Sequence, residues 1–293
     1  MKRRQVMEKR PAVSVIMSVY NPSPFCQLEA AVGSVLEQTF ADFELLLYND
    51  GSNEAASEKM RQLARSDARI LYLESEKNRG IASGLNRCIE KARGKYIARM
   101  DGDDLLLRER LEVQVRFLEL NGQYDFVGTG AWLFDEGGIW GERLMKEKPE
   151  KEDFLPFSPY IHPTVMFRRS VFEKCGLYNE SEKVRRCEDY ELFVRLHILG
   201  CYGYNLQEKL ICYREGKDSW KKRRFCYRLD EMRFRREGFQ ALGLTGGKAW
   251  LCRFRPLAAG LVPRMAGRWL KRRQAVCRGE ERIWTGPIPQ KIQ

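Results

Sequence analysis

Short apolar runs and helical patterns alternate along the first 130 residues of the chain. The run from Val13 to Val19 is rich in β-branched residues, which is typical of a parallel strand buried on both faces. Further apolar runs, interpreted as strands, occupy residues 43–48, 70–73 and 95–100. Helices are expected at residues 28–38 and 80–92, where apolar residues recur at helical spacing, and at residues 54–64, where the helix is polar. Strands that alternate with helices predict an α/β fold with a mostly parallel, Rossmann-like central sheet flanked by helices.

The middle of the chain is less regular. We expect strands at residues 125–134 and 161–167, the second of them interrupted by His162-Pro163, and a helix at residues 187–199. The pattern predicts a basic arm at residues 1–11, an α/β domain at residues 12–217 and a basic amphipathic helical tail at residues 218–293.

In the predicted tail, one helical pattern opens at Lys221 and is broken by glycines between 243 and 247. A second pattern, from Trp250 to Leu261, is interrupted by Pro256. We therefore expect helices with apolar and basic sides.

Polar residues gather where three of the predicted strands end. The three clusters are Ser18 to Asn21, Asn49 to Ser52 and Asp101 to Asp104. In open α/β sheets, ligands bind outside the carboxyl ends of the strands. We therefore expect the three clusters to line one crevice.

The third cluster, Asp101-Gly102-Asp103-Asp104, places three carboxylates within four residues. Like charges this close repel at neutral pH unless a cation neutralises them. Carboxylate oxygens suit Mg²⁺ or Mn²⁺. The alternative is a solvated acidic turn that caps the following helix. Its position at the end of an apolar strand, beside two other polar strand ends, favours the metal site.

Five further residues each have two interpretations. Asp50 either begins a turn or accepts a hydrogen bond from a ring N–H of a ligand. Glu188 and Asp189 begin a helix, where the helix dipole favours acidic residues, but a carboxylate there can also act as a general base. His162 either packs in the core or lines the site, and the spacing of His197 favours a structural role.

Composition excludes several classes of protein. The chain has 293 residues, of which 43% are hydrophobic, as in folded globular proteins. Its longest apolar stretches, such as residues 257–262, are too short to span a bilayer. The charged start lacks a secretory h-region, and the nine cysteines form no CxxC pair. These features exclude a membrane-spanning protein, a secreted disulfide scaffold and a zinc finger, and predict a cytoplasmic setting.

The net charge of +12 is concentrated in the predicted tail. Residues 218–293 hold 19 Lys and Arg against 6 Asp and Glu, a net charge of +13, so the preceding residues carry −1. Basic residues beside Trp and Phe suit a helix that lies on an anionic membrane, where each contributes about 1 kcal/mol. The alternative is that these helices pack on the preceding domain with a basic outer face.

With these motifs in hand, the chain from about Ala12 to Arg214 resembles a bacterial family 2 glycosyltransferase of the GT-A fold. The motifs that carry the resemblance, in order, are VSVIMSVYN (13–21), QTF (38–40), NDGS (49–52), NRG (78–80) with Asn86, GKYIARMDGDD (94–104), HPT (162–164) and EDY (188–190). The QxxRW-type motif and the membrane helices of processive synthases are absent from the sequence, so a single-transfer enzyme is expected.

The resemblance implies a donor site at the strand ends. Ser18 and Tyr20 match the segment that packs on the nucleotide base and ribose. Asp50 matches the position that hydrogen-bonds the uracil ring N–H in members that use UDP-sugars. Arg79 and Asp101 match further donor-binding positions.

The resemblance also implies a metal pair and a base. Asp101 and Asp103 match the DxD pair that holds Mn²⁺ or Mg²⁺ on the diphosphate, and Asp189 matches the base that deprotonates the acceptor hydroxyl. The implied reaction is an inverting, hexosyl-type transfer from a nucleotide-sugar, most simply a UDP-sugar, to a glycan or lipid-linked acceptor. Such enzymes assemble bacterial surface polysaccharides, so residues 218–293 are expected to bind the inner face of the cell membrane peripherally.

The basic tail supports a different class of function, a nucleic-acid- or polyanion-binding protein. That hypothesis leaves Asp50, Asp101 and Asp103 without a role, so no specific nucleic acid is expected as a partner. A sugar-nucleotide-binding protein without transfer activity is disfavoured because both the DxD pair and Asp189 are retained. A nucleotidyltransferase would need a phosphate loop near the first strand, and residues 18–24 do not form one.

Overall fold

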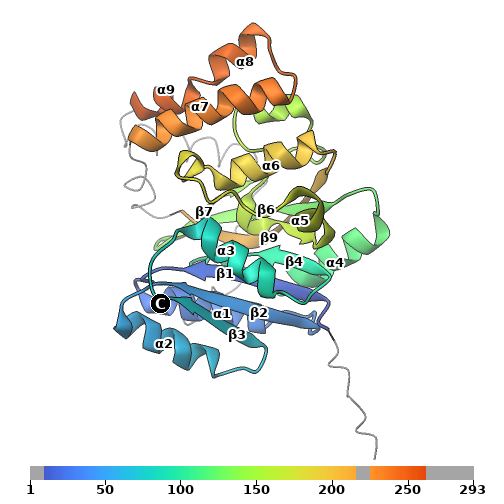
Figure 1. The fold of residues 1–293 in the computed structure, drawn as a ribbon. Helices are drawn as coiled ribbons and strands as arrows, with labels where there is room; N and C mark the ends of the chain where they lie inside the picture. Colours follow the sequence, from blue (N-terminus) through green and yellow to red (C-terminus); the bar gives the residue numbers. More distant parts are fainter. Residues whose placement is uncertain (1–9, 216–224, 262–293) are drawn as a thin grey trace, which may run out of the picture.

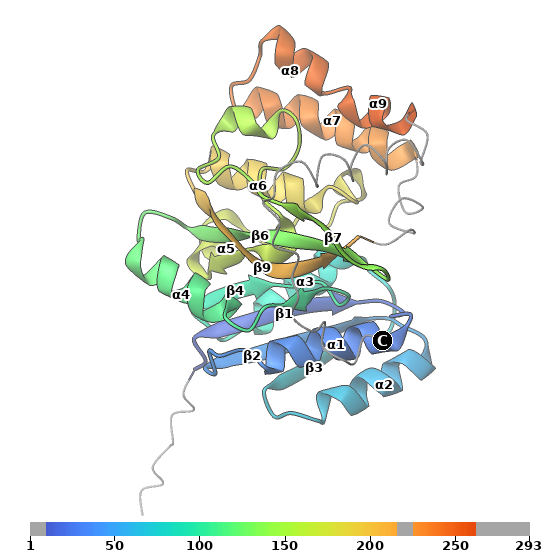
Figure 2. The ribbon, with the colours of Figure 1, turned by 180° about the vertical axis from the view of Figure 1, so that it is seen from behind.

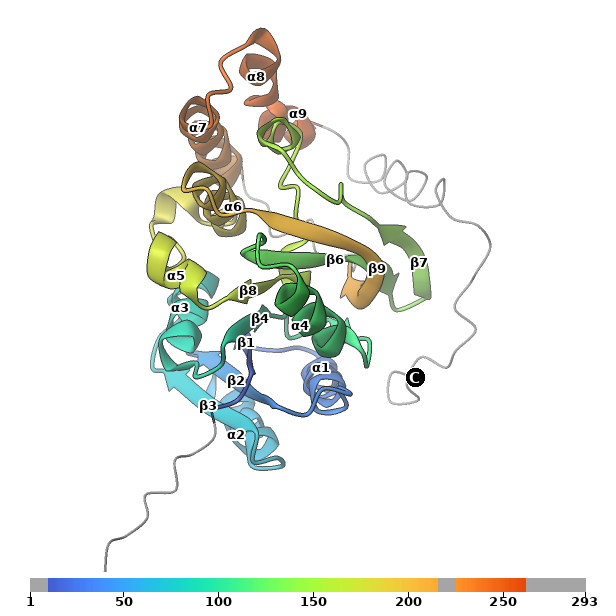
Figure 3. The same ribbon diagram turned by 90° about the vertical axis from the view of Figure 1, so that its right-hand side faces the viewer.

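The computed structural model describes residues 10–215 and 225–261, and within them nine strands form one sheet. The strand order is β3-β2-β1-β4-β8-β6-β9-β5, with β7 paired to β6. Figure 3 shows this order along the sheet from β3 toward β9. The α/β fold predicted from the sequence is confirmed.

The first half of the sheet is parallel. Its strands are β1 (Val13–Val19), β2 (Phe43–Asp50), β3 (Ile70–Ser75) and β4 (Tyr96–Arg99). The helices that connect them are α1 (Phe25–Leu36), α2 (Glu54–Ala64) and α3 (Ile81–Lys91). Strand β1 lies between β2 and β4, and all three pairings in this half are parallel, so the carboxyl ends of these strands meet at one edge. This half agrees with the apolar pattern of the sequence.

The second half of the sheet is mixed. Its strands are β5 (Leu105–Leu106), β6 (Phe126–Asp135), β7 (Gly138–Arg143), β8 (Met166–Arg168) and β9 (Gly203–Arg214). Strand β8 is antiparallel to both β4 and β6, whereas β9 is parallel to β6 and antiparallel to β5. The predicted parallel order therefore holds for β1–β4, and the sheet as a whole is mixed.

The expected strand at residues 161–167 is only partly present. His162–Thr164 form a short 3₁₀ helix (η2), and the strand proper, β8, covers Met166–Arg168. Pro163 has no backbone N–H to donate to a neighbouring strand and its φ angle is fixed, so the ladder cannot begin until it is passed.

Helices cover both faces of the sheet and bury two hydrophobic clusters. Helices α1, α2 and α4 (Arg110–Leu120) pack on one face. Helices α3, α5 (Ser170–Cys175) and α6 (Glu188–Ile198) pack on the other. Figures 1 and 2 show the two faces from opposite sides. Two further 3₁₀ turns, η1 (Lys151–Phe154) and η3 (Glu182–Val184), complete the second face.

The described part of the predicted tail packs against the rest of the protein. It forms α7 (Phe225–Ala241), α8 (Gly247–Cys252) and α9 (Arg255–Leu261), next to α6 at one end of the molecule (Figure 1). Phe239 and Ala249 are buried in the hydrophobic cluster that contains Tyr190 of α6. The packing alternative therefore holds for residues 225–261, and the two helical patterns are separated at the expected places. No helix of the described segments has the length and apolarity that crossing a bilayer requires.

Part of the sequence prediction lies outside the described residues. This applies to most of the basic arm at residues 1–11, to the expected helix start at Lys221, and to residues 262–293. The domain boundaries that we drew from the sequence stay predictions.

Candidate active site at the carboxyl edge of the sheet

The ends of β1 and β2 are tied together by their own polar side chains. The backbone N–H of Asn21 donates to Ser52 Oγ at 2.9 Å, and Asn21 Oδ1 accepts from the N–H of Asn53 at 2.9 Å. Asn21 has φ +43°, in the left-handed region that Asn tolerates better than most residues. The first two polar clusters therefore lie side by side, as the sequence predicted.

Ser18 and Tyr20 occupy different environments at the end of β1. Ser18 packs against α3, since a Cβ added to Gly84 would lie 2.1 Å from Ser18 Oγ. Only glycine allows this close approach of α3 to β1. The Tyr20 ring is 53% exposed, which leaves its face accessible to a ligand.

The carboxylate of Asp50 binds the segment that opens α3. Oδ1 accepts from the N–H of Arg79 at 2.9 Å, and Oδ2 accepts from the N–H of Gly80 and from Asn78 Nδ2, both at 2.9 Å. Burial raises the pKa of Asp50, and these N–H groups oppose that rise. The side chain of Arg79 is exposed beside it. In the turn after β2, the N–H of Ser52 is bound by Asn49 Oδ1 at 3.0 Å and not by Asp50. Asp50 instead fixes the segment that opens α3, and its Oδ1 accepts one hydrogen bond among the described residues.

An ion pair joins the end of β4 to the acidic loop that follows it. Asp101 Oδ1 lies 2.5 Å from Arg99 Nη2, and the side chain of Arg99 is only 4% exposed. Burial opposes the charge on Arg99, but the carboxylate of Asp101 outweighs it and raises the pKa of the guanidinium. Part of the positive charge that the sequence argument assigned to a metal ion is therefore supplied by the protein itself.

Asp103 and Asp104 of the same loop differ in exposure. The carboxylate of Asp104 is fully buried, and Oδ1 accepts from the N–H of Arg214 at 2.7 Å. Its Oδ2 has no hydrogen-bond partner among the described residues. Burial, followed by repulsion from Asp101 and Asp103, raises the pKa of Asp104 well above its ordinary value. Asp103 is exposed, and its carbonyl oxygen accepts from Arg214 Nε at 2.9 Å.

The acidic loop fits a divalent cation only if the ligand completes the coordination. Within residues 10–215 and 225–261, no three His, Cys, Asp or Glu side chains are arranged to hold a metal ion together. The unpartnered Asp104 Oδ2 and the mutual repulsion of the three carboxylates are both relieved by a nearby cation. Hard oxygen donors of this kind match Mg²⁺ or Mn²⁺ with phosphate oxygens as the remaining ligands.

Glu188 and Asp189 begin α6, and the charge of Arg99 in β4 acts on both carboxyl groups. Burial, then the negative charge of Asp189, raises the pKa of Glu188 to about 7. Burial also raises the pKa of Asp189, while the positive charge of Arg99 lowers it. The electrostatic influence of Arg99 therefore reaches from the acidic loop to the start of α6.

His162 and His197 are both buried, and each lies within hydrogen-bond distance of a tyrosine hydroxyl. His162 Nε2 lies 2.7 Å from the hydroxyl of Tyr178, and burial with the nearby charge of Arg99 lowers the pKa of His162 well below its ordinary value. His197 Nε2 lies 2.9 Å from the hydroxyl of Tyr160, and burial lowers its pKa to about 4. Both histidines are therefore neutral near pH 7, and the structural role expected for His197 is confirmed.

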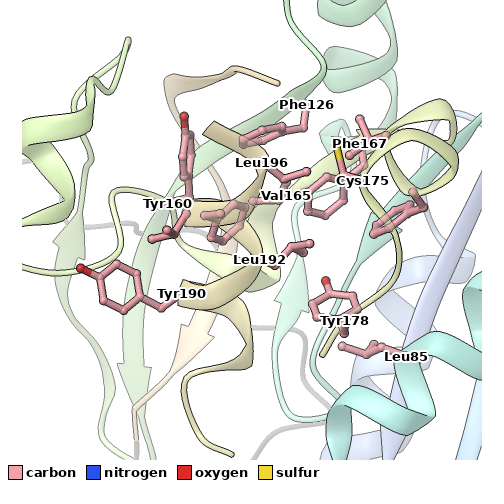
Figure 4. Close-up of a cluster of buried hydrophobic side chains, with 14 of the residues drawn as sticks. Leu85, Phe126, Tyr160, Val165, Phe167, Cys175, Tyr178, Tyr190, Leu192 and Leu196 are labelled. Atoms are coloured by element: carbon pink, nitrogen blue, oxygen red, sulfur yellow. The ribbon is translucent and has the colours of Figure 1, made fainter. Parts of the chain in front are cut away.

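Sequence reasoning missed Tyr178 and the role of Arg99. Asn86 of α3 holds the backbone of Tyr178 with both amide atoms, at 2.8 and 2.9 Å. Figure 4 shows Tyr178 beside Leu85 in the buried cluster. Asn86 belongs to the motifs that carry the family resemblance, but its partner, Tyr178, lies 92 residues away in the sequence. The sequence signal for Arg99 is that a charged residue interrupts the apolar run 95–100, two positions before Asp101.

Helix α7 packs against the first turn of α6, the helix that begins with Glu188 and Asp189. Arg235, 4% exposed, donates to the carbonyl of Leu155 at 3.0 Å, and its guanidinium lies 4.9 Å from the centroid of the Tyr190 ring. Tyr190 itself donates to the carbonyl of Phe154. The helix that carries Asp189 is thus fixed at its first turn by residues from two other segments.

A cavity of about 310 Å³ lies at the opposite, amino edge of the parallel strands. It is lined by residues that include Glu44, Arg69 and Arg93. Arg93 pairs with Glu44 at 2.9 Å and Arg69 with Asp67 at 2.8 Å, so the charges on its wall are compensated within the protein. The carboxyl edge, where compensation is incomplete, is the better candidate for a site.

The chain is similar to known glycosyltransferases in sequence. The family model described as "Glycosyl transferase family 2" matches residues 14–176. The chain is 40% identical over 228 residues to "Putative glycosyltransferase EpsE" of Bacillus subtilis (strain 168), covering 76% of this chain and 80% of the relative. It is 33% identical to "Amylovoran biosynthesis glycosyltransferase AmsE" of Erwinia amylovora, covering 72% and 79% of the two chains.

Solved structures share the fold. A TM-score of 0.66 relates the chain to S. aureus TarS 1–349 in complex with UDP-GlcNAc, at 14% identity, covering 89% of this chain and 79% of that one. A TM-score of 0.61 relates it to the mannosyltransferase PcManGT of Pyrobaculum calidifontis in complex with GDP-Man and Mn²⁺, at 17% identity, covering 93% and 82%.

Proposed function

The chain belongs to glycosyl transferase family 2, and from that premise we propose that it transfers a sugar from a UDP-sugar to a hydroxyl group of a glycan or lipid-linked acceptor in bacterial polysaccharide synthesis. The chain is a glycosyltransferase with the GT-A fold. The observation that carries the proposal is the convergence of three polar strand ends with the start of α6, where the charge of Arg99 acts on Asp101, Asp104 and Asp189.

The nucleoside of the donor binds at the ends of β1 and β2 in this proposal. The exposed ring of Tyr20 stacks on the donor, and the free acceptor position of Asp50 Oδ1 takes a ring N–H of uracil. The bonds from Arg79 and Gly80 hold that carboxylate in one orientation before the ligand arrives. Ser18 and the exposed side chain of Arg79 complete this end of the site.

The diphosphate of the donor binds at the acidic loop, with Mn²⁺ or Mg²⁺ held by Asp101 and Asp103. When bound, such an ion supplies Lewis-acid stabilisation of the departing nucleoside diphosphate. Arg99 orients Asp101 for this role through their ion pair, and Arg214 fixes the backbone of the loop. The position of the loop is therefore set by residues of the chain on two sides.

Asp189 acts as the general base in an inverting, single-displacement transfer. It must be ionised to accept the proton of the acceptor hydroxyl, and the positive charge of Arg99 favours that state against the effect of burial. His162 is neutral, so it contributes a hydrogen bond to the site rather than a charge. A single displacement requires no covalent nucleophile, and none is assigned.

Calorimetry of UDP binding, with and without Mn²⁺, tests this proposal most directly. Native protein is expected to bind UDP tightly only with the metal ion, and Asp103→Ala to lose the metal-dependent part. Glu109→Ala, which removes an exposed carboxylate outside the loop, is the matched control and should behave as the native protein. A UDP affinity that changes neither on addition of Mn²⁺ nor in Asp103→Ala would contradict the metal role. Absence of binding by UDP, GDP, dTDP and CMP alike would overturn the donor site.

The described part of the tail supports an additional proposal, peripheral binding to an anionic membrane. Trp250 and Leu251 of α8 are 54% and 65% exposed, and the guanidinium of Arg253 lies 5.0 Å from the Trp250 ring. An exposed apolar pair next to basic residues suits an interface with anionic headgroups. Flotation with vesicles that contain phosphatidylglycerol should recover the protein, and Trp250→Ser with Leu251→Ser should reduce recovery. Equal recovery of both proteins would contradict this role for α8.

A further inference from the structure

Arg99 is a buried cation at the carboxyl edge, 3% exposed. It is the last residue of β4, paired in register with Ile16 of β1. Ile97, two residues earlier on the same face, packs in the cluster beneath α3 and α6, whereas Ala98 packs in the cluster of the opposite face. Since side chains alternate along a strand, Arg99 points toward the side of α3 and α6.

The hydrogen-bonding capacity of Arg99 is largely unused within the protein. Nη2 pairs with Asp101, but Nε and Nη1 are buried and reach no acceptor among the described residues. By contrast, every side-chain nitrogen of the equally buried Arg235 has a partner. Arg110 uses its Nε and Nη2 and leaves only Nη1 without a partner among the described residues. A buried guanidinium with unpaired N–H groups is costly, so these groups need an acceptor that a ligand can provide.

The surroundings of Arg99 define the chemistry of that ligand. Its charge acts on Asp101 and Asp104 at the loop and on Glu188 and Asp189 at α6. Arg110 also interacts with Asp104, and Arg186 with Glu188, but the four acidic side chains still outnumber these cations. An additional anionic group at this point would be repelled. A hydroxyl fits, because its oxygen accepts from the guanidinium while its proton is donated to a carboxylate.

We propose that Arg99 is a donor-specificity residue, whose free N–H groups donate to a ring hydroxyl of the sugar being transferred while Asp101 accepts the proton of a hydroxyl of that ring. This inference rests on the proposed function, in which the sugar lies between the diphosphate at the acidic loop and the base on α6. The ligand is accordingly a neutral, polyhydroxylated hexose ring rather than a uronic acid. The nucleotide moiety binds elsewhere, at the ends of β1 and β2.

The first test separates recognition of the sugar from recognition of the nucleotide. Among UDP-glucose, UDP-galactose and UDP-N-acetylglucosamine, the tightest ligand of the native protein is compared with UDP by calorimetry. In Arg99→Met the preference for the UDP-sugar over UDP is expected to fall by about 10- to 100-fold, the range for hydrogen bonds to charged groups. Arg110→Lys, which alters another buried guanidinium beneath the same loop, should keep the preference. An unchanged preference in Arg99→Met, or an equal loss for UDP and UDP-sugar, overturns the proposal.

A second test uses the native fold and does not depend on the stability of Arg99→Met. The ring-deoxy analogues of the chosen UDP-sugar, each lacking one hydroxyl, are titrated against native protein and Arg99→Lys. One analogue should bind native protein about 10- to 100-fold more weakly than the parent, and the same deletion should cost Arg99→Lys much less. Penalties that are the same in both proteins overturn the proposal while leaving the transferase function intact. Failure of every nucleotide and nucleotide-sugar to bind native protein overturns both.

Discussion

Buried charged groups are paired at the amino edge of the parallel strands and incompletely paired at the carboxyl edge. At the amino edge, the 3% exposed Glu44 accepts from Ser14 Oγ at 2.6 Å, from the N–H of Arg93 at 2.7 Å and from Arg93 Nε at 2.9 Å. At the carboxyl edge, Asp104 Oδ2 and two nitrogens of Arg99 have no partner among the described residues. A cavity of about 310 Å³ lies at the amino edge, where the charges are paired. Incomplete pairing of buried charge therefore locates the chemistry better than the shape of the surface does.

The largest effect is expected from removal of the proposed base, Asp189. This variant tests whether the carboxyl edge carries the chemistry. Asp189→Asn should lower the transfer rate by about 1,000-fold, because general-base catalysis contributes about 10²- to 10⁴-fold. Affinity for UDP should stay unchanged, since Asp189 lies at α6 and not at the ends of β1 and β2. Rates are measured as UDP release in the presence of acceptor. A rate that stays within tenfold of native would remove Asp189 from the mechanism.

Removal of the paired carboxylate at the amino edge should affect stability and not binding. Glu44→Ala leaves the N–H of Arg93 and the Ser14 hydroxyl without their acceptor, which costs about 3 kcal/mol of unfolding free energy. Asp104→Asn is the contrasting variant at the carboxyl edge. It keeps an acceptor for the N–H of Arg214 and removes a repelled charge, so stability without divalent cations should be equal or higher. Urea unfolding of both proteins measures this, and a larger loss in Asp104→Asn would reverse the comparison.

The acidic pair at the start of α6 should give the stability a distinctive pH dependence. Glu188 has an ordinary pKa of 4.5, raised in the fold to about 7, so the folded state binds more protons than the unfolded state between these values. Stability should therefore decrease as pH rises from about 4.5 to 7 by about 2 kcal/mol. Glu188→Gln should flatten this slope in thermal melts recorded across the range. An identical slope in both proteins would show that Glu188 does not titrate this way.

The smallest effect is expected from the wall of the amino-edge cavity. Arg69→Ala breaks a surface pair with Asp67 and should cost less than about 1 kcal/mol of stability. UDP affinity, measured by calorimetry, should stay within about twofold of native. A clear loss of nucleotide binding would place ligand chemistry at the amino edge and reverse the comparison.

The parallel half of the fold could be predicted from the sequence because its information is local. The apolar run of β1 and the helical spacing of α2 identify these elements at the observed residues, and α2 even begins at its Asn53 N-cap. The three strand-end clusters follow from the rule for parallel sheets. Their convergence is confirmed at the ends of β1 and β2 by the bonds of Asn21.

The rest could not be predicted because it depends on partners far apart in the chain. Strand β5 pairs with β9, and Asp104 is bound by Arg214, 110 residues later. No periodic pattern encodes such a pairing. The three carboxylates of the acidic loop are evident in the sequence, but the counter-charge that pairs with Asp101, Arg99, gives only a weak signal. The roles assigned to Asp189, Asp103 and the other site residues stay predictions until the binding experiments are made.

The bonds from Arg214 to the acidic loop have a consequence for the order in which activity is acquired during synthesis. The ribosome releases β1 to β4 and the loop early, whereas β9 and the N–H that binds Asp104 emerge more than 100 residues later. Arg235, which braces the helix carrying Asp189, emerges later still. Chains released prematurely before residue 214 therefore contain all four parallel strands, but they lack the N–H that binds Asp104 and the guanidinium that packs on Tyr190. The order of synthesis thus makes the carboxyl edge of the sheet the last part of the fold to be completed.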